Sequence, residues 1–175
     1  MCPYLTEPVD HLLRPLFEKR TINETMPGLV TQGPGDPELV NLVRDYVRQE
    51  PIASKPELVA ALWLYVDELD ESHKVSQGIE TPTGSYWHAI MHRREGDFDN
   101  ARHWYRRVGI HPAQSRITSA GGGAGSGTAI GPFDPIDFVD RVERAVRRGD
   151  TDLPELVAIQ RREWRTLFEW CLEHL

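Results

Sequence analysis

The chain has 175 residues, of which 39% are hydrophobic and 27% are charged, and its formal net charge at pH 7 is −7. These values fit one soluble domain with a substantial core, and the negative charge argues against a nucleic-acid binder or a protein that coats anionic membranes. No apolar run is long enough to cross a bilayer. The cysteines, Cys2 and Cys171, lie near opposite ends without metal-ligand spacing, which predicts reduced thiols in a cytoplasmic protein.

Three helices are predicted in the first part of the chain. Apolar residues at helical spacing predict the first over residues 9–20. The second is expected to begin at Asp36, as N-cap, and Pro37, as first helical residue. The third follows a capping box at residues 54–57 and runs to a polar, acidic end at residues 67–73.

The central stretch predicts a helical hairpin, with helices over residues 85–95 and 97–108 joined at Gly96. The spacing of small and aromatic residues is similar to the second half of a tetratricopeptide unit. The matching positions are Gly96, Phe98, Ala101, Tyr105 and Val108. No second copy follows at the period of that repeat, so the pattern indicates one such hairpin inside a non-repeating bundle.

The last part of the chain predicts a flexible Gly-rich loop at residues 119–131 and two further helices. Asp134 caps the first of these, Gly149 ends it, and residues 152–155 start the last helix. No segment shows the two-residue alternation of a strand. We therefore expect an all-α, single-domain bundle of about seven helices over residues 1–175.

One polar stripe on the predicted helix 85–95 suggests a metal site. At about 100° per residue, His88, His92 and Glu95 share a face, and histidines one turn apart can reach one ion. His73, at the end of the preceding helix, is the expected third histidine ligand, with Glu95 as another ligand or a base. This hypothesis implies a divalent ion such as zinc, manganese or iron and a metal-dependent hydrolase in which His88, His92 and Glu95 are catalytic.

A second interpretation is an anion site without metal. Four arginines flank the histidines, and guanidinium groups bind phosphates and carboxylates in a bidentate manner. Trp104 would stack on a planar ligand, and His88 or His92 would act as acid or base. The arginines are Arg93, Arg94, Arg106 and Arg107. They could equally pair with the acidic excess, for example with Asp67.

Two further alternatives stay open. The hairpin could belong to a non-enzymatic module that presents its arginines and aromatic residues to an acidic peptide or protein partner. The motif could also be a structural network of hydrogen bonds within the bundle. The enzyme hypothesis requires His88 and His92 to point into a concave site, whereas the module hypothesis requires them to be packed or solvated.

The words DESH at residues 70–73, SYWHAIMHRREGD at 85–97 and NARHWYRRVG at 100–109 resemble a family of uncharacterised all-helical proteins that share this motif. That resemblance implies membership but no activity. A helix carrying two histidines four residues apart, with another histidine elsewhere, is also similar to helical-bundle metal-dependent hydrolases of the DinB-like kind. Asp70, His73 and Trp104 are second-rank members of the expected site.

Overall fold

Prolines mark the starts of most helices in the computed structural model, which describes residues 7–117 and 133–174. Pro suits the first helical position because its missing N–H has no partner there in any helix. The described residues form eight α-helices and one short 3-10 helix, without strands, so the all-α prediction is confirmed. The helices are α1 Glu7–Lys19, α2 Pro37–Tyr46, α3 Pro56–Tyr65, α4 Leu69–Ser76, α5 Pro82–Glu95, α6 Phe98–Val108, the 3-10 helix Pro112–Arg116, α7 Pro135–Arg147 and α8 Pro154–His174. The predicted Gly-rich loop lies outside the described residues.

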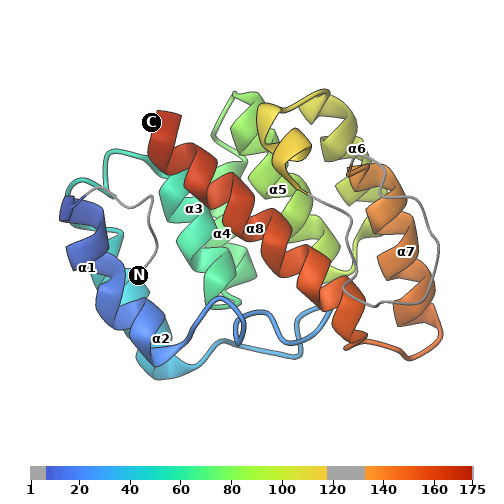
Figure 1. Cartoon of the computed structure of the whole chain (residues 1–175), viewed down its shortest axis with the longest axis horizontal. Helices are drawn as coiled ribbons and strands as arrows, with labels where there is room; N and C mark the ends of the chain where they lie inside the picture. The colour runs from blue at the N-terminus through green and yellow to red at the C-terminus, as the bar shows by residue number, and fades with distance from the viewer. Residues whose placement is uncertain (1–6, 118–132, 175) are drawn as a thin grey trace.

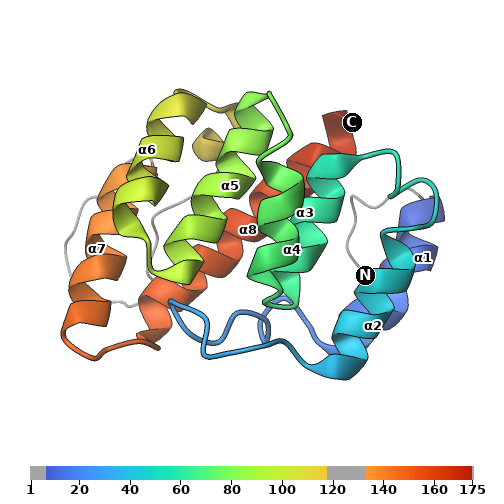
Figure 2. The ribbon, with the colours of Figure 1, turned by 180° about the vertical axis from the view of Figure 1, so that it is seen from behind.

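The helix α8 crosses one face of the bundle. It runs in front of α3 and α5 in Figure 1, and in Figure 2 it lies behind them while α4 faces the viewer. The pair α1 and α2 lies at one end and α7 at the other, with α5 and α6 between. The helix α5 packs against α3, α4 and α6, and is therefore the central element of the fold.

Two hydrophobic clusters hold these helices together. The larger joins α1–α6 to α8, and its biggest fully buried side chains include Trp87 and Tyr65. The smaller lies between α7 and the first half of α8 and centres on Phe138, Val142 and Ile159. Cys171 is buried as a free thiol in the larger cluster, whereas Cys2 lies outside the described residues.

The segment around residues 54–73 differs from the prediction. No capping box forms at residues 54–57, because the Ser54 hydroxyl bonds to Glu50 at 2.7 Å, and Lys55 occupies the N-cap without a side-chain hydrogen bond. The predicted single helix is also interrupted. Asp67 adopts a left-handed backbone with φ of 62°, so α3 ends at Tyr65 and a separate helix, α4, begins at Leu69. This break accounts for the additional helix.

The chain leaves α6 through a turn built on a buried histidine. His111 Nδ1 accepts a hydrogen bond from the Ala113 backbone N–H at 3.2 Å, and its Nε2 lies 3.2 Å from the Thr83 hydroxyl on α5. Nδ1 is therefore the acceptor nitrogen of a neutral ring. Burial, with a smaller contribution from His174, lowers the pKa of His111 to about 4.

Acid should weaken the fold through His111. In the unfolded chain the imidazole takes a proton near its ordinary pKa of about 6.5, whereas the folded ring resists protonation down to about 4. The free energy of unfolding should therefore fall as the pH drops through this window, and His111 should contribute no pH dependence above it. His111→Asn keeps an acceptor at the cap but does not titrate. Urea unfolding at a series of pH values should therefore show that its free energy of unfolding falls less steeply with decreasing pH than that of the wild type. The exposed His103→Gln is the control. An unchanged pH dependence of the free energy of unfolding in His111→Asn would show that His111 is not the group responsible.

Candidate site of three histidines

Three imidazoles meet between α4 and α5. His73 comes from α4, and His88 and His92 come from α5. One ligand atom from each lies within 4.8 Å of the others. The ring centroids are 4.8 Å apart for His73 and His88, 5.2 Å for His73 and His92, and 4.7 Å for His88 and His92. The structure thus brings together the three histidines that the sequence analysis assigned to a metal.

Local structure explains why these rings converge. His88 and His92 are one turn apart on α5, so their side chains lie on the same face. On α4, Ser72 is fully buried and its hydroxyl donates to the Ala60 carbonyl of α3 at 2.9 Å. This contact fixes the rotation of α4 about its axis. The next residue, His73, consequently faces α5.

Burial keeps two of the three rings neutral. His88 and His92 are only 2% and 4% exposed, whereas His73 is half-buried. Burial lowers the pKa of His88 to about 3, and repulsion from His92 and His73 contributes further. Burial also lowers the pKa of His92, against an opposing effect of Glu95. Neutral imidazoles offer the free lone pairs that a metal ion needs.

Glu95 sets the orientation of His92. Its Oε2 lies 3.0 Å from His92 Nδ1, so the neutral ring donates from Nδ1 to the carboxylate and leaves Nε2 unprotonated. The Asn100 amide nitrogen lies 3.1 Å from Nε2 and 3.4 Å from Nδ1. An atom on the in-plane lone pair of one ring nitrogen would be much farther from the other. These near-equal distances place the amide over the face of the ring, so the in-plane lone pair of Nε2 stays open.

Trp104 covers His88 from α6. The two rings stack with centroids 4.0 Å apart and an interplanar angle of 13°, and the Arg107 guanidinium lies 4.9 Å from the Trp104 ring centroid. The buried Nδ1 of His88 has no hydrogen-bond partner among the described residues. Trp104 therefore lies beside the three histidines and contacts His88, and its predicted stacking on a ligand stays a prediction. One nitrogen of His88 lacks the partner that a buried polar atom normally has.

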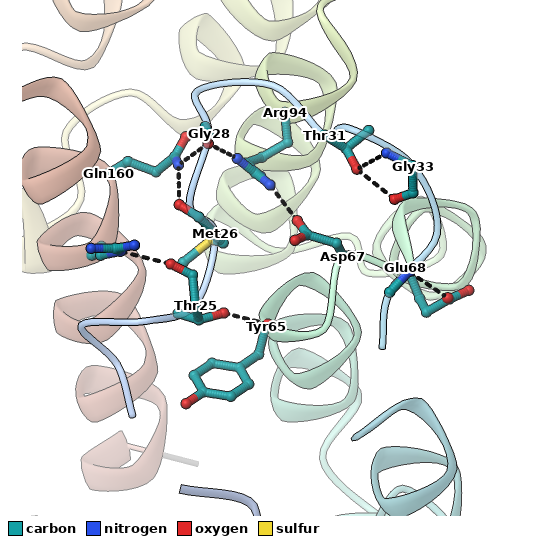
Figure 3. A network of polar contacts seen from close by, with 12 residues as sticks. Thr25, Met26, Gly28, Thr31, Gly33, Tyr65, Asp67, Glu68, Arg94 and Gln160 are labelled. Carbon is teal, nitrogen blue, oxygen red and sulfur yellow. Dashed lines mark hydrogen bonds and ion pairs between the residues drawn. The ribbon is translucent and has the colours of Figure 1, made fainter. Parts of the chain in front are cut away.

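The structure does not place Arg94 at the histidines. Its guanidinium is buried and donates to the Gly28 carbonyl and to Asp67, as Figure 3 shows. Gln160 of α8 also donates to the Gly28 carbonyl, at 2.9 Å, and Thr31 N–H donates to the Arg94 carbonyl at 2.8 Å. Arg94 thus fastens the loop after α1 to α5 and α8. Arg94 therefore pairs with Asp67, which is the alternative to ligand binding that the sequence left open for the arginines.

This loop also borders a cavity of about 240 Å³. Arg20, Glu24, Asp67 and Arg94 line it together with residues of the segment 27–36. Each of these four side chains already has a partner in the same region, through the pairs Arg20–Asp36, Glu24–Thr21 and Arg94–Asp67. The cavity is separate from the histidines.

Arg93 is likewise removed from the histidines, because it points toward α8. It donates to Glu163 at 2.5 Å and to the Tyr105 hydroxyl at 2.7 Å, and that hydroxyl donates to the other Glu163 oxygen at 2.7 Å. Its guanidinium also lies 4.5 Å from the Phe138 ring centroid. Burial by itself would lower the pKa of Arg93, but Glu163 raises it above its ordinary value. Arg93 is therefore a permanent cation in a buried network, and its position excludes the predicted ligand contact at the histidines.

The remaining predicted residues lie at the surface. Arg106 and Arg107 are exposed on α6, and neither has an ion-pair partner among the described residues. Glu95 is half-exposed beside His92. Asp70 is exposed one turn before His73.

Two residues of this region were not assigned by the sequence analysis. Glu163 carried a readable signal, since it stands four residues from both Ile159 and Leu167 on the apolar face of α8 and a buried acid needs a partner. Asn100 is brought over His92 by the turn at Gly96, with φ of 92°. The turn residue was predicted, but the angle between the helices was not.

Comparison of the chain with protein-family models, with curated proteins and with solved structures finds no match. The family resemblances proposed from the motif therefore stay predictions. Within residues 7–117 and 133–174, no helix has the length and apolar character required to cross a membrane.

The network of Arg93 should dominate stability. Arg93→Met leaves Glu163 buried without its cation, and removal of one partner of such a pair costs about 3–5 kcal/mol. The double variant Arg93→Met/Glu163→Leu should recover much of that loss because both charges are gone. Exposed Arg106→Met, the matched control, should change the free energy of unfolding by less than about 0.5 kcal/mol. Urea unfolding measures all three, and a double variant that is no more stable than Arg93→Met would refute the pairing as the cause.

Proposed function

We propose that the protein holds a divalent transition-metal ion on His73, His88 and His92 and uses it in hydrolase-type chemistry. The observation that carries the proposal is the convergence of three imidazole ligand atoms within 4.8 Å of one another. Two of the rings are buried, and burial and mutual repulsion keep them neutral. Neutral imidazole is the form that binds zinc and its neighbours.

The separation of the rings fits an ion after a small adjustment. Nitrogen atoms on a tetrahedral zinc ion lie about 3.4 Å apart when each Zn–N bond is about 2.0–2.1 Å. The observed upper limit of 4.8 Å therefore requires a modest rotation of the side chains. His73, the half-buried member, has the most freedom to make it.

Three histidine ligands leave a fourth position open, which is the arrangement of catalytic rather than structural zinc sites. An ion held in this way would supply a water with a pKa near neutrality, and thus a nucleophile for hydrolysis. The chain itself contributes orientation, because Glu95 holds His92 by Nδ1 and leaves Nε2 as the nitrogen that would bind the ion, as in the carboxylate–histidine–metal arrangement. Trp104 packs on His88 and keeps water from that ring.

The surface around Trp104 supports an anionic substrate. The Arg107 guanidinium lies over this ring, 4.9 Å from its centroid, and neither Arg107 nor Arg106 has a carboxylate partner among the described residues. Both guanidinium groups lie on α6, the helix that also carries Trp104. They favour a phosphate or carboxylate ligand at the site.

The same two arginines favour the second candidate function, a tetratricopeptide-like module whose α5–α6 hairpin binds an acidic peptide. The burial of His88 and His92 meets the condition set for the module, and not the concave site required by the enzyme hypothesis, so variants of the histidines are needed to separate the two candidates. A peptide-binding module has no need of His73, so His73→Ala should leave peptide affinity unchanged, whereas Arg106→Ala/Arg107→Ala should lower it.

Metal binding by the purified chain tests the main proposal. After incubation with zinc and removal of excess, plasma mass spectrometry should give close to one equivalent for the wild type and for His103→Ala, which alters an exposed histidine on α6. His73→Ala should lose the metal while its circular dichroism stays unchanged, since His73 is only half-buried. Zinc at 100 times its Kd should stabilise the wild type by about 2.7 kcal/mol. That gain corresponds to a rise of roughly 5–10 °C in Tm.

Two results would overturn the metal site. One is the absence of zinc, manganese, iron and cobalt from the folded wild type after incubation with each. The other is retention of one equivalent by His73→Ala with unchanged affinity.

Glu95 provides an independent test of the ligand geometry. Glu95→Ala should lower zinc affinity by about 10–100-fold, because the partner that orients His92 is lost. The exposed Glu80→Ala is the matched control, since it removes the same charge before the start of α5. Competition with a chromophoric chelator measures both constants. Equal affinities for the two variants would show that the carboxylate does not orient a metal ligand.

A further inference from the structure

The carboxamide of Asn100 stands at the edge of the three-histidine site. Its amide nitrogen lies over the His92 ring, 3.1 Å from Nε2, and the structure gives this side chain no other hydrogen-bond partner among the described residues. Its backbone N–H donates to the Asp97 carboxylate at 3.2 Å, which fixes the residue in the first turn of α6. The amide is thus held in place but is not saturated.

The position of the amide matters because Nε2 of His92 is the nitrogen left open for a metal. An ion on the in-plane lone pair of Nε2 would be about 2.0–2.1 Å from that atom. The Asn100 amide nitrogen, above the ring plane, carries N–H donors and no available lone pair, so it does not act as a ligand to that ion. Its N–H donors are then available to an atom bound to that ion.

We infer that Asn100 is a positioning residue that donates from its amide to an anion bound at the open metal position. This inference rests on the proposed function, since it requires the ion. The chemical class it selects is a small anion or an anionic oxygen of a substrate, which accepts but does not donate. The unpaired guanidinium of Arg107 beside Trp104 adds positive charge on the same side of α6.

Cobalt and azide provide the test, because bound Co²⁺ reports in the visible spectrum both its own binding and that of an added anion. Titration of the wild type with Co²⁺ should give one equivalent, and azide should then change the spectrum with a measurable Kd. Asn100→Ala should keep the Co²⁺ affinity and the Tm but bind azide about tenfold more weakly, as expected for a lost hydrogen bond to a charged group. Asn23→Ala is the matched control. It changes an exposed asparagine in the loop after α1 and should behave as the wild type.

The possible outcomes separate the two claims. Failure of the wild type to bind Co²⁺ overturns the metal site and this inference with it. Binding of Co²⁺ with no response to azide overturns the inference alone, because the fourth position would then be closed. Equal azide affinity in Asn100→Ala and Asn23→Ala also overturns the inference while the metal site stands.

Discussion

Two adjacent arginines at the end of α5 hold the bundle together. Arg93 and Arg94 are both buried, and their guanidinium groups reach different neighbours because consecutive residues of a helix point about 100° apart. Arg93 binds Glu163 of α8, whereas Arg94 binds Asp67 and the Gly28 carbonyl. A buried cation without a carboxylate is severely destabilising. The positions of α8, of the α3–α4 junction and of the loop after α1 are therefore coupled to this one turn.

The same turn leaves the other face of α5 free for the histidines. His88 and His92 lie away from the two arginines, toward α4 and α6, and their neighbours His73 and Trp104 come from those helices. Asp67 links the two sides, because its left-handed backbone starts the turn into α4 while its carboxylate neutralises Arg94. The placement of His73 thus depends on the ion pair behind it as well as on its own helix.

Local sequence rules predict much of this arrangement, whereas the contacts between residues far apart in the chain were not predicted. Asp36 and Asp134 cap their helices as predicted, and Gly96 makes the expected turn of the hairpin. The spacing of His88 and His92 placed them on one face. The break at Asp67 was missed, because its left-handed backbone is stabilised by a contact with Arg94, which is 27 positions away in the chain. The burial of Arg93 was missed for the same reason, since its partner is 70 positions away.

The three histidines and the network of Arg93 are both largely buried polar clusters, but they differ in their hydrogen bonding. Arg93, Glu163 and Tyr105 bond to one another, as polar groups buried for stability should. Within the described chain no hydrogen bond joins the three imidazoles, and His88 Nδ1 has no partner. Burial of neutral rings in this state costs free energy that a leucine would not. Stacking on Trp104 and the hydrogen bond of His92 to Glu95 offset part of that cost. We propose that an ion shared by the three imidazoles offsets the rest, since His88 Nδ1 is left without a partner among the described residues.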